Sequence, residues 1–425
     1  MQATEDLATV LNQACYCRTL DPDRLRHEID SDASAHGLMQ SITQTRPHLF
    51  SSTAVFLTPT AAQQLADTVD AIERVMALPG YVAQALARAP AIAGQLAGPR
   101  GVCMGYDFHI AESSPRLIEI NTNAGGLLLN AALLRAQVAC CEAMHWSLKA
   151  QTPSGSLEPA LQAMFIAEWS LQRGAASLKR VAIVDDDPAD QYLAPEFELF
   201  KQFFIRMGVD AMVVDPSELQ WRNKQLWHGE NMVDMVYNRL TDFYLEAAPH
   251  QALRQAYEAG AVVLTPDPRA HALYADKRNL VVLSNDTLLA SWGALDTDRA
   301  VLRAAVPQTR LVEAGQAEEL WAQRKQLFFK PVAGYGSKAT YRGDKLTKRV
   351  WGEILSGDFV AQALVAPSER QIKVDEVVTD LKFDIRAYTY AGQVQLLAAR
   401  MYSGQTTNFR TEGGGFAPVV VASAG

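Results

Sequence analysis

The chain has 425 residues, of which 48% are hydrophobic and 20% are charged, and this length and composition are typical of a soluble globular protein with two or three domains. The formal net charge of −8 argues against a nucleic acid or an anionic membrane surface as a partner held by bulk electrostatics. No apolar run reaches the length of a membrane span, and the first residues lack a signal-peptide pattern, so we expect a cytoplasmic protein without a membrane or nucleic-acid partner.

The cysteines match neither a zinc-binding pattern nor a disulfide framework. They are odd in number, at Cys15, Cys17, Cys103, Cys140 and Cys141. The adjacent pair Cys140-Cys141 falls in a stretch with helical spacing, where neighbouring side chains diverge. The sequence therefore predicts reduced, free thiols.

The first hundred residues are predicted to be helical. Apolar residues recur at helical spacing in Ala61–Met76, after the start signal Thr58-Pro59-Thr60, and Val82–Leu96 is rich in alanine. We expect residues 1–100 to form a helical N-terminal segment with a regulatory or substrate-facing role.

A β-hairpin is predicted next, with strands Gly105–Ile110 and Leu117–Ile120 and a turn at Ser113-Ser114-Pro115. Alternate residues of a strand share a face, so Glu119 and Asn121 point the same way.

Pairing of these strands would place Asp107 near Glu119. A cluster of carboxylate and amide oxygens suits a hard cation that carries phosphates. The alternative is a hairpin with solvated acidic residues, and the hairpin sequence taken alone does not favour either interpretation.

A helical stretch, Leu127–Lys149, follows the hairpin, and Gln151–Ser156 is a predicted boundary before an amphipathic helix at Leu157–Arg173. We expect residues 101–177 to form one unit made of the hairpin and these helices.

Residues 178–270 alternate between apolar strands and helices, which predicts a parallel sheet covered on both faces. The predicted strands are Arg180–Asp185, Ala211–Asp215, Met232–Leu240 and Ala261–Leu264. The region lacks a GxGxxG turn, so a dinucleotide site is not supported. Asp185-Asp186-Asp187 is interpreted as a solvated strand-end loop.

Residues 271–425 have an α+β pattern. A strand, Gln326–Pro331, contains Lys330 and precedes a glycine-containing loop at Ala333–Arg342. A lysine on a strand can contact phosphates, and glycines let backbone N–H groups approach them, although the loop is not a Walker A sequence. A further strand is predicted at Phe359–Val365.

A second hairpin is predicted from Lys382–Tyr390 and Gln393–Tyr402, and it carries Arg386 and Arg400. Phosphoryl transfer depends on positioning and charge neutralisation by cationic side chains and Mg²⁺. We expect Lys277 and Lys330 to bind phosphates and the two arginines to face a developing phosphate charge.

These motifs resemble the ATP-grasp ligases. The resemblance is carried by Lys277, the strand Phe328-Phe329-Lys330-Pro331 with its loop, Phe359–Val365 and the pair Asp107 … Glu119-Ile120-Asn121. The acidic pair precedes the lysines here, an order similar to the circularly permuted ATP-grasp group that includes glutathionylspermidine synthetase. The resemblance spans most of residues 101–425.

The resemblance implies a circularly permuted ATP-grasp fold of mixed α/β and α+β class. Residues 101–177 would be the metal-binding hairpin and helices of the core, 178–270 a pre-ATP-grasp-like α/β domain, and 271–425 the ATP-binding lid and the rest of the core. It assigns ATP binding to Lys277, Lys330, Gly334, Gly336, Ser337, Gln362 in the hinge and Glu369 at the ribose, Mg²⁺ binding to Asp107, Glu119 and Asn121, and catalysis to Arg386 and Arg400.

The implied activity is ATP-dependent ligation of a small-molecule or peptide carboxylate to an amine through an acyl phosphate. One departure is Gly105, where the related pattern has an arginine two residues before the hairpin Asp; Arg386 or Arg400 is the candidate replacement. The other is the lack of a recognisable cysteine–histidine amidase domain. A phosphotransferase or a non-catalytic nucleotide-binding protein remains an alternative, as does a homo-oligomer.

Overall fold

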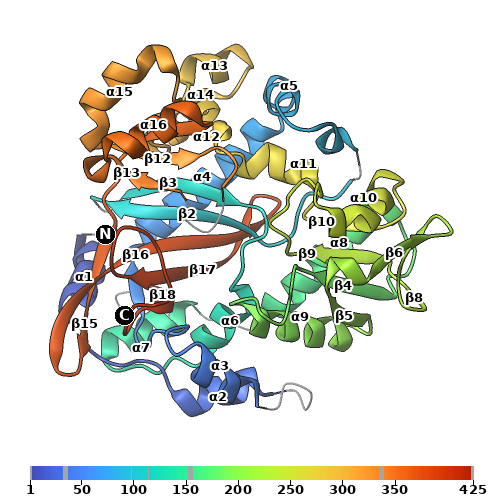
Figure 1. Ribbon diagram of the computed structural model, residues 1–425. Coiled ribbons are helices and arrows are strands. Elements are labelled where there is room, and N and C mark those ends of the chain that lie inside the picture. The colour runs from blue at the N-terminus through green and yellow to red at the C-terminus, as the bar shows by residue number, and fades with distance from the viewer. Residues whose placement is uncertain are drawn as a thin grey trace.

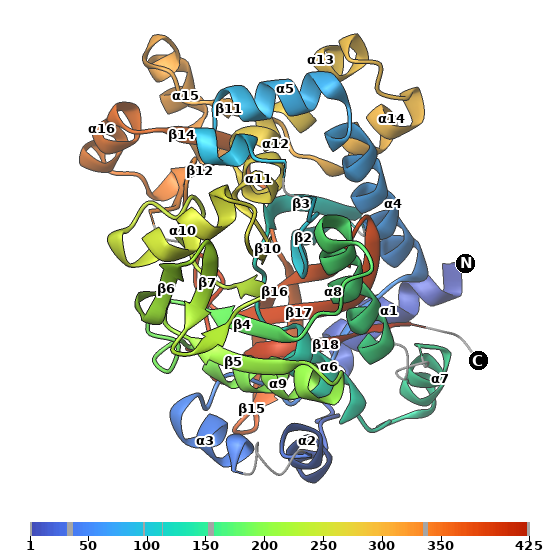
Figure 2. The same cartoon turned by 90° about the vertical axis from the view of Figure 1, so that its right-hand side faces the viewer.

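The computed structural model describes residues 2–31, 37–96, 98–112, 114–151, 157–334 and 339–422. In this part of the chain the strands form a large central sheet, a parallel sheet with a small three-stranded sheet beside it, and a further four-stranded sheet. Figures 1 and 2 show the last of these above the central sheet, with the parallel sheet to one side of both.

The central sheet joins the beginning and the end of the chain. Its strands lie in the order β1 (Val55–Leu57), β18 (Gly415–Val421), β17 (Gln393–Tyr402), β16 (Val377–Tyr390), β2 (Met104–Ala111) and β3 (Ser114–Asn121), and β15 (Ser368–Val374) pairs with β16. Only β1 and β18 pair in parallel; the other neighbours are antiparallel. The strand β1 lies inside the segment that was predicted to be helical, because three apolar residues are too short a run to show a period.

Both predicted hairpins are present in this sheet. The β16–β17 turn is made by Ala391 and Gly392, whose φ angles of 47° and 81° suit the tight turn that follows the strand twist. The β2–β3 turn is tighter than predicted, since Ser114 and Pro115 already belong to β3. Proline is tolerated there because β3 is an edge strand.

The parallel sheet confirms the predicted alternation of strands and helices. Its order is β10 (Val263–Thr265), β9 (Met235–Asn238), β4 (Arg180–Val184) and β5 (Asp210–Val214), with helices α8 (Leu157–Arg173), α9 (Ala194–Arg206) and α10 (Gln251–Glu258). Buried aromatic rings of α8, α9 and β9 pack edge to face, with Phe165 4.7 Å from Phe204 and 5.4 Å from Tyr237. The small sheet of β6 (Leu219–Arg222), β7 (Gln225–His228) and β8 (Asn231–Met232) was not predicted.

The third sheet, called here the lid sheet, has the order β11 (Thr309–Leu311), β14 (Phe359–Ala363), β12 (Leu327–Pro331) and β13 (Tyr341–Arg342). All its pairs are antiparallel. The helices α15 (Ala317–Gln323) and α16 (Lys348–Ser356) share a core with it, in which Phe329 packs against Trp351. The helices α12 (Arg278–Leu283), α13 (Asp286–Ser291) and α14 (Asp296–Ala305) lie before it in the sequence.

The N-terminal helices are α1 (Gln2–Ala14), α2 (Pro22–Ile29), α3 (Leu38–Thr45), α4 (Pro59–Met76) and α5 (Pro79–Ala87). The helix α4 begins as predicted, because the Thr58 side chain accepts a hydrogen bond from the Ala61 N–H and Pro59 occupies the first turn. It buries Leu65, Val69 and Ile72 in one core with the central sheet. This packing contributes most to its stability, at about 25 cal/mol per Å² of buried apolar surface.

The prediction of one helix at Leu127–Lys149 is wrong in one respect, because the segment forms two helices. They are α6 (Leu127–Arg135) and α7 (Glu142–Gln151). Between them Gln137 forms a β-bridge with Leu20, so the backbone is extended there. Cys140 and Cys141 lie in this connection and not on a helix, which corrects the expectation that a helix separates their side chains.

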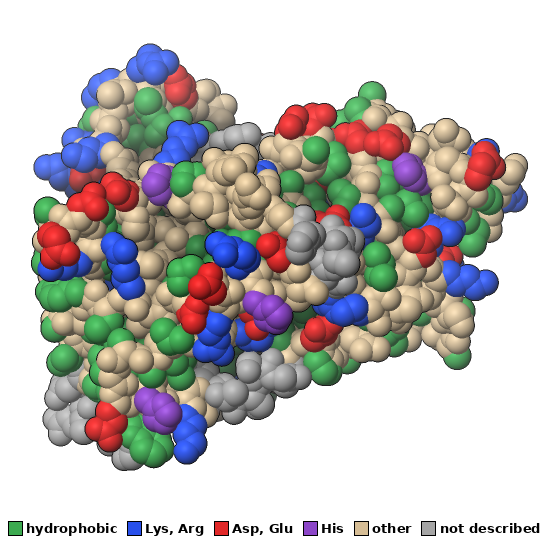
Figure 3. All heavy atoms as spheres, turned by 90° about the horizontal axis from the view of Figure 1, so that it is seen from below, with side chains coloured by type: hydrophobic (Ala, Val, Ile, Leu, Met, Phe, Trp, Pro, Cys, Tyr) green, Lys and Arg blue, Asp and Glu red, His purple; other side chains and the backbone are tan. Residues whose placement is uncertain are grey.

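No described helix combines the length and the apolarity that crossing a membrane requires. On the face of the molecule seen from below, acidic and basic side chains are interspersed (Figure 3).

Candidate active site

The β2–β3 hairpin brings the predicted acidic residues together. Asp107 and Glu119 are directly opposite each other across the two strands. The Asn121 side chain lies on the same face and donates hydrogen bonds to Asp107 Oδ2 at 3.1 Å and to Glu119 Oε1 at 3.4 Å. The hairpin interpretation of the sequence is therefore correct in its geometry.

A β-bulge follows these residues. Asp107 pairs with Glu119 but Phe108 pairs with Leu117, which leaves Ile118 unpaired in the ladder. The free Ile118 carbonyl instead accepts a hydrogen bond of 2.8 Å from Lys330 Nζ. The bulge thus connects the central sheet to the lid sheet.

The neighbouring strands β16 and β17 extend this polar row with a chain of ion pairs. Arg386 is opposite Asp107, and Arg400 is opposite Asp384, so all four share one face of the sheet. The Arg386 guanidinium donates from Nε and Nη2 to the two Asp107 oxygens, both at 2.7 Å. Arg400 bridges the two carboxylates, donating to Asp107 at 2.8 Å and to Asp384 at 2.7 Å.

This row is buried, and its charges control one another. Burial alone would raise the pKa of Asp107, but Arg386 and Arg400 outweigh it and lower that pKa to about 2. The same pairing raises the pKa of Arg400 despite burial. Asp107 is therefore a carboxylate at any physiological pH.

The lid sheet supplies the opposite wall. Lys330 on β12 is 4% exposed, and its Nζ also donates to Gln362 Oε1 on β14 at 2.9 Å. Burial lowers the pKa of Lys330 to about 8, and the nearby Glu119 carboxylate only partly offsets this effect. The other amide atom, Gln362 Nε2, is buried and lacks a hydrogen-bond partner in the described structure, so it is able to donate to a ligand.

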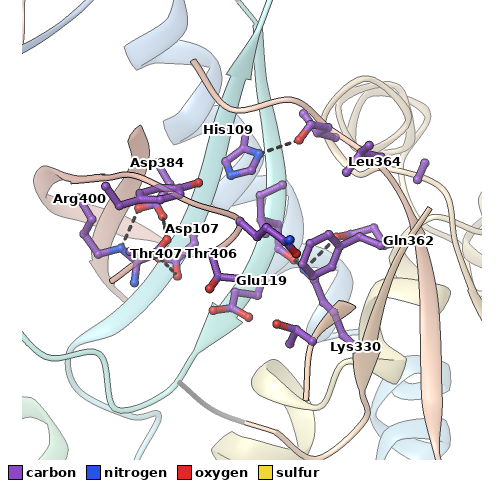
Figure 4. A pocket seen from close by; sticks show the side chains of 17 residues that line it. Asp107, His109, Glu119, Lys330, Gln362, Leu364, Asp384, Arg400, Thr406 and Thr407 are labelled. Atoms are coloured by element: carbon purple, nitrogen blue, oxygen red, sulfur yellow. Dashed lines mark hydrogen bonds and ion pairs between the residues drawn. The ribbon is translucent and has the colours of Figure 1, made fainter. Parts of the chain in front are cut away.

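The two walls enclose a cavity in which Glu119 and Lys330 both point inward (Figure 4). His109 closes one side, with Nδ1 2.9 Å from the Val365 carbonyl oxygen, and Thr407 donates a hydrogen bond to Asp384 on the other. The lining residues are Asp107, His109, Ile118, Glu119, Phe328, Lys330, Thr340, Gln362, Ala363, Leu364, Val365, Asp384, Arg400, Tyr402, Gln405, Thr406 and Thr407.

The structure brings together most of the predicted site residues. Asp107, Glu119, Lys330, Gln362 and Arg400 line the cavity. Arg386 and Asn121 contact Asp107 from the side, as described above.

Lys277 is buried and is not among the residues that line this cavity. Its Nζ donates a hydrogen bond of 2.6 Å to the Gly334 carbonyl, and its backbone N–H contacts the Val332 carbonyl at 3.4 Å. Lys277 and Gly334 are thus adjacent to each other, while the predicted Gly336 and Ser337 lie outside the described residues.

Glu369 is the predicted residue that the structure places elsewhere. It is exposed on β15 and lines a different cavity, together with Asn12, Phe56 and Asp380. The reason is that the chain leaves the hinge at Ala366-Pro367 to pair β15 with β16, away from the lid sheet. The ribose role for Glu369 is therefore withdrawn.

Sequence reasoning missed Asp384, His109 and Thr407 as site residues. Asp384 precedes Arg386 by two positions in a strand, and His109 follows Asp107 by two, so alternation along β16 and β2 is a signal that could have found both. Thr407 lies in a loop, where no sequence period exists.

The comparisons with known proteins identify the fold. No family model and no curated protein matches the sequence. Among solved structures, a glutathione synthetase-like effector from Globodera pallida in its apo form aligns with 95% of this chain and 98% of its own, at a TM-score of 0.55 and 11% identity. This chain therefore has the same fold.

Two further solved structures are less similar to this chain. A protein assigned as a gamma-glutamylcysteine synthetase from Methylobacillus flagellatus covers 82% of this chain and 83% of its own, at a TM-score of 0.45 and 11% identity. The ATP-grasp ligase PsnB, in complex with a minimal precursor, Mg and ADP, covers 56% of this chain and 88% of its own, at a TM-score of 0.29 and 13% identity.

Proposed function

We propose that this chain, which has the predicted ATP-grasp fold, is an ATP-dependent ligase that joins a carboxylate to an amine. The observation that carries the proposal is that Lys330 and Glu119, 211 residues apart and on different sheets, line one cavity. Beside it lie Arg386 and Arg400, whose side chains are only 9% and 14% exposed. Cationic and acidic groups held rigidly around one space are what phosphoryl transfer requires.

In this proposal the nucleotide is held within residues 271–425, by the lid sheet and by the loop that connects β12 to β13. Lys330 and Lys277 would contact the phosphates, and the hydrogen bond from Lys277 Nζ to the Gly334 carbonyl holds Lys277 at the start of the loop that follows β12. Gln362 Nε2 would donate to the nucleotide, because it is buried without another acceptor in the described residues.

The donor set fits Mg²⁺, although not equally at each residue. In the described structure the hydrogen bond that the Glu119 carboxylate accepts is the 3.4 Å contact from Asn121 Nδ2, so its oxygens are available to a metal ion. Rotation of the Asn121 amide would turn its oxygen toward the same ion. Asp107 Oδ2 already accepts from three groups, while Oδ1 accepts only from Arg386 Nε. Glu119 and Asn121, with Asp107 Oδ1, would therefore hold the ion, which would neutralise phosphate charge.

Arg386 supports the ligase over a simple phosphotransferase. A Cβ atom at Gly105 would lie 2.5 Å from the Ala124 Cβ and 3.2 Å from Arg386 Nε, so no side chain fits there. The Arg386 guanidinium lies against Gly105. In the related ATP-grasp pattern the arginine occupies the position that Gly105 has in this chain. We propose that Arg386 replaces that arginine and, with Arg400, orients the acceptor carboxylate.

The proposed reaction has two steps. A carboxylate oxygen of the acceptor attacks the γ-phosphorus of ATP, ADP leaves, and an acyl phosphate forms. The amine then attacks the acyl carbon and loses a proton, inorganic phosphate leaves with the electron pair of the broken C–O bond, and an amide remains. Orientation and the exclusion of water from the cavity protect the acyl phosphate from hydrolysis.

Hydroxylamine trapping tests the type of product. We expect incubation with Mg·ATP, a library of small and peptide carboxylates, and hydroxylamine to give a hydroxamate for the true acceptor, because hydroxylamine intercepts an acyl phosphate. If ATP is consumed and the acceptor becomes a stable phosphate ester, with no hydroxamate formed, the protein is instead a phosphotransferase. Binding of Mg·ATP without turnover across the library would favour a non-catalytic protein.

The lowered pKa of Lys330 predicts proton uptake on nucleotide binding. At pH 8.5 much of the free protein carries a neutral Lys330, since its pKa is about 8, and bound phosphates favour the ammonium form. Titration calorimetry in two buffers of different ionisation enthalpy should therefore show uptake of most of one proton per ATP analogue at pH 8.5, and little at pH 6.5. Equal heats in both buffers at pH 8.5 would contradict this role.

A further inference from the structure

Three cysteine thiols meet at a point remote from the cavity. Cys15 follows the end of α1, Cys17 lies two residues on, and Cys140 belongs to the connection between α6 and α7. Their sulfur atoms all lie within 4.8 Å of one another, and those of Cys15 and Cys140 are 3.9 Å apart. This cluster could not be predicted from spacing in the sequence, because 125 residues separate Cys15 from Cys140.

The backbone holds the two segments together. The Val138 N–H donates to the Thr19 carbonyl at 2.8 Å, and the Thr19 hydroxyl donates to Gln137 Oε1 at 2.7 Å. On the other side, α1 and α7 pack in one apolar cluster with β1 and β18, through Leu11 and Met144. These contacts fix the approach of the segment that follows α1 to the connection between α6 and α7, and with it the approach of Cys15 to Cys140.

The spacing of the sulfur atoms fits a metal better than a disulfide. Zinc–sulfur bonds of about 2.3 Å place the sulfurs of a tetrahedral site about 3.8 Å apart. The Cys15–Cys140 separation of 3.9 Å matches this edge without rearrangement. A disulfide requires sulfurs about 2.05 Å apart, so the two thiols are not bonded to each other as they are placed.

A buried arginine next to the thiols gives an independent indication. Arg370 on β15 is fully buried, and its guanidinium donates only to oxygens that carry no charge, among them the carbonyls of Cys15 and Ala54. It has no carboxylate partner in the described part of the chain, although a buried charge normally has one.

Thiolates would supply the missing charge. The Arg370 guanidinium donates to the Cys15 carbonyl at 2.7 Å, which places its positive charge beside the cluster. A bound metal keeps thiols deprotonated, so a loaded site would place negative charge beside this guanidinium.

We propose that Cys15, Cys17 and Cys140 bind a zinc ion as thiolates. Sulfur ligands select zinc over the Mg²⁺ expected in the cavity, where the donors are oxygens. Each ligating thiol releases its proton to solvent. Cys141 is exposed and close enough to interact with Cys17 and Cys140, so it is the nearest further thiol for the fourth position.

The site would be structural. It ties the helix α1 to the connection before α7, at the edge of the central sheet where β1 pairs with β18. Because metal binding in such sites is coupled to folding, zinc should raise the Tm of the protein.

Cobalt titration of the full-length, reduced and metal-stripped chain tests the proposal. We expect one Co²⁺ per chain, sulfur-to-cobalt charge-transfer absorption, d–d bands of a tetrahedral ion, and displacement by one equivalent of zinc. Cys15→Ser and Cys140→Ser should each abolish the charge-transfer absorption and the zinc-dependent rise in Tm. The control Cys103→Ala, which removes the buried cysteine outside the cluster, should retain both.

Three outcomes would overturn the proposal: no thiolate absorption on saturation with Co²⁺, equal cobalt binding by Cys140→Ser, or a Cys15–Cys140 disulfide in freshly purified protein. Titration of Cys140→Ser with Mg·ATP analogue separates this site from the active site. We expect the nucleotide affinity of this variant to be unchanged, so failure of the zinc proposal would leave the ligase proposal intact. Likewise, a chain that fails to bind the nucleotide but binds zinc would contradict the ligase proposal alone.

Discussion

A Lys330→Met variant is expected to lose about 100- to 1,000-fold in the rate of ATP turnover, the range seen when one preorganised donor to a developing charge is removed. Lys330 is the cation on the lid-sheet wall of the cavity, held between Ile118 and Gln362. Methionine replaces the apolar stem of the side chain almost atom for atom but removes the terminal ammonium group and its charge. Glu119→Gln should cause a loss in the same range, because the amide no longer carries the charge that attracts Mg²⁺.

The stability of Lys330→Met distinguishes a catalytic role from a structural one. Below pH 8 the buried ammonium is destabilising, because its folded-state pKa of about 8 is below the ordinary value of 10.5, and this penalty disappears as the pH rises from 8 to 10.5. Losing the two hydrogen bonds acts in the opposite direction. We therefore expect the free energy of unfolding at pH 7 to change by no more than about 1–2 kcal/mol.

Lys325→Met is the matched control for turnover, since Lys325 is exposed just before the same strand β12. It should keep full activity with the acceptor identified by hydroxamate formation. Activity within threefold of the unmodified protein in Lys330→Met, with an unchanged unfolding curve, would remove this residue from the site.

Asp107→Asn is expected to lower the free energy of unfolding by about 3–5 kcal/mol at pH 7, the cost of removing one partner from a buried ion pair. The variant leaves Arg386 without an acidic partner in the described structure, and Arg400 with Asp384 alone. Urea denaturation followed by circular dichroism measures the change. Asp380→Asn, an exposed carboxylate on the same strand β16, is the control and should change stability by less than about 0.5 kcal/mol.

The effect of Asp107→Asn should depend on pH in a defined direction. The folded-state pKa of Asp107 is about 2, below its ordinary value of 3.8, so the stabilisation is complete above pH 4 and is lost as the pH falls towards 2. The difference between the two proteins should narrow over that range. A difference that is already absent at pH 7 would show that the arginines are solvated and not buried against Asp107.

The sequence predicted the parts of the fold that have a strong local period. The parallel sheet of residues 178–270 and the hairpin turning at Ala391-Gly392 are both present, because continuous apolar strands and a tight turn are local signals. The pairing of Asp107 with Glu119 was predictable for the same reason: a short turn fixes the register of its strands.

The features that were missed depend on contacts distant in sequence. The break between α6 and α7 arises from the bridge between Gln137 and Leu20, and the strand β1 exists because β18 offers an edge to Val55–Leu57. The spacing of apolar residues in a local stretch of sequence contains no information about Leu20 or β18, which are distant partners in the chain.

The candidate site shows the same division. The residue types and their order indicated Lys330, Glu119 and the arginines, whereas the bulge that frees the Ile118 carbonyl for Lys330 is a property of the folded hairpin. Glu369 was misplaced because the path of the chain after Pro367 is decided by pairing with β16.

Titration with a non-hydrolysable ATP analogue, with and without Mg²⁺, is the most direct test of the central claim that two separate sheets hold one metal–nucleotide complex. We expect saturable, Mg²⁺-enhanced binding by the unmodified chain, loss of the Mg²⁺ enhancement in Glu119→Gln, and loss of binding under both conditions in Lys330→Met. Identical, Mg²⁺-independent affinities for all three proteins would contradict it.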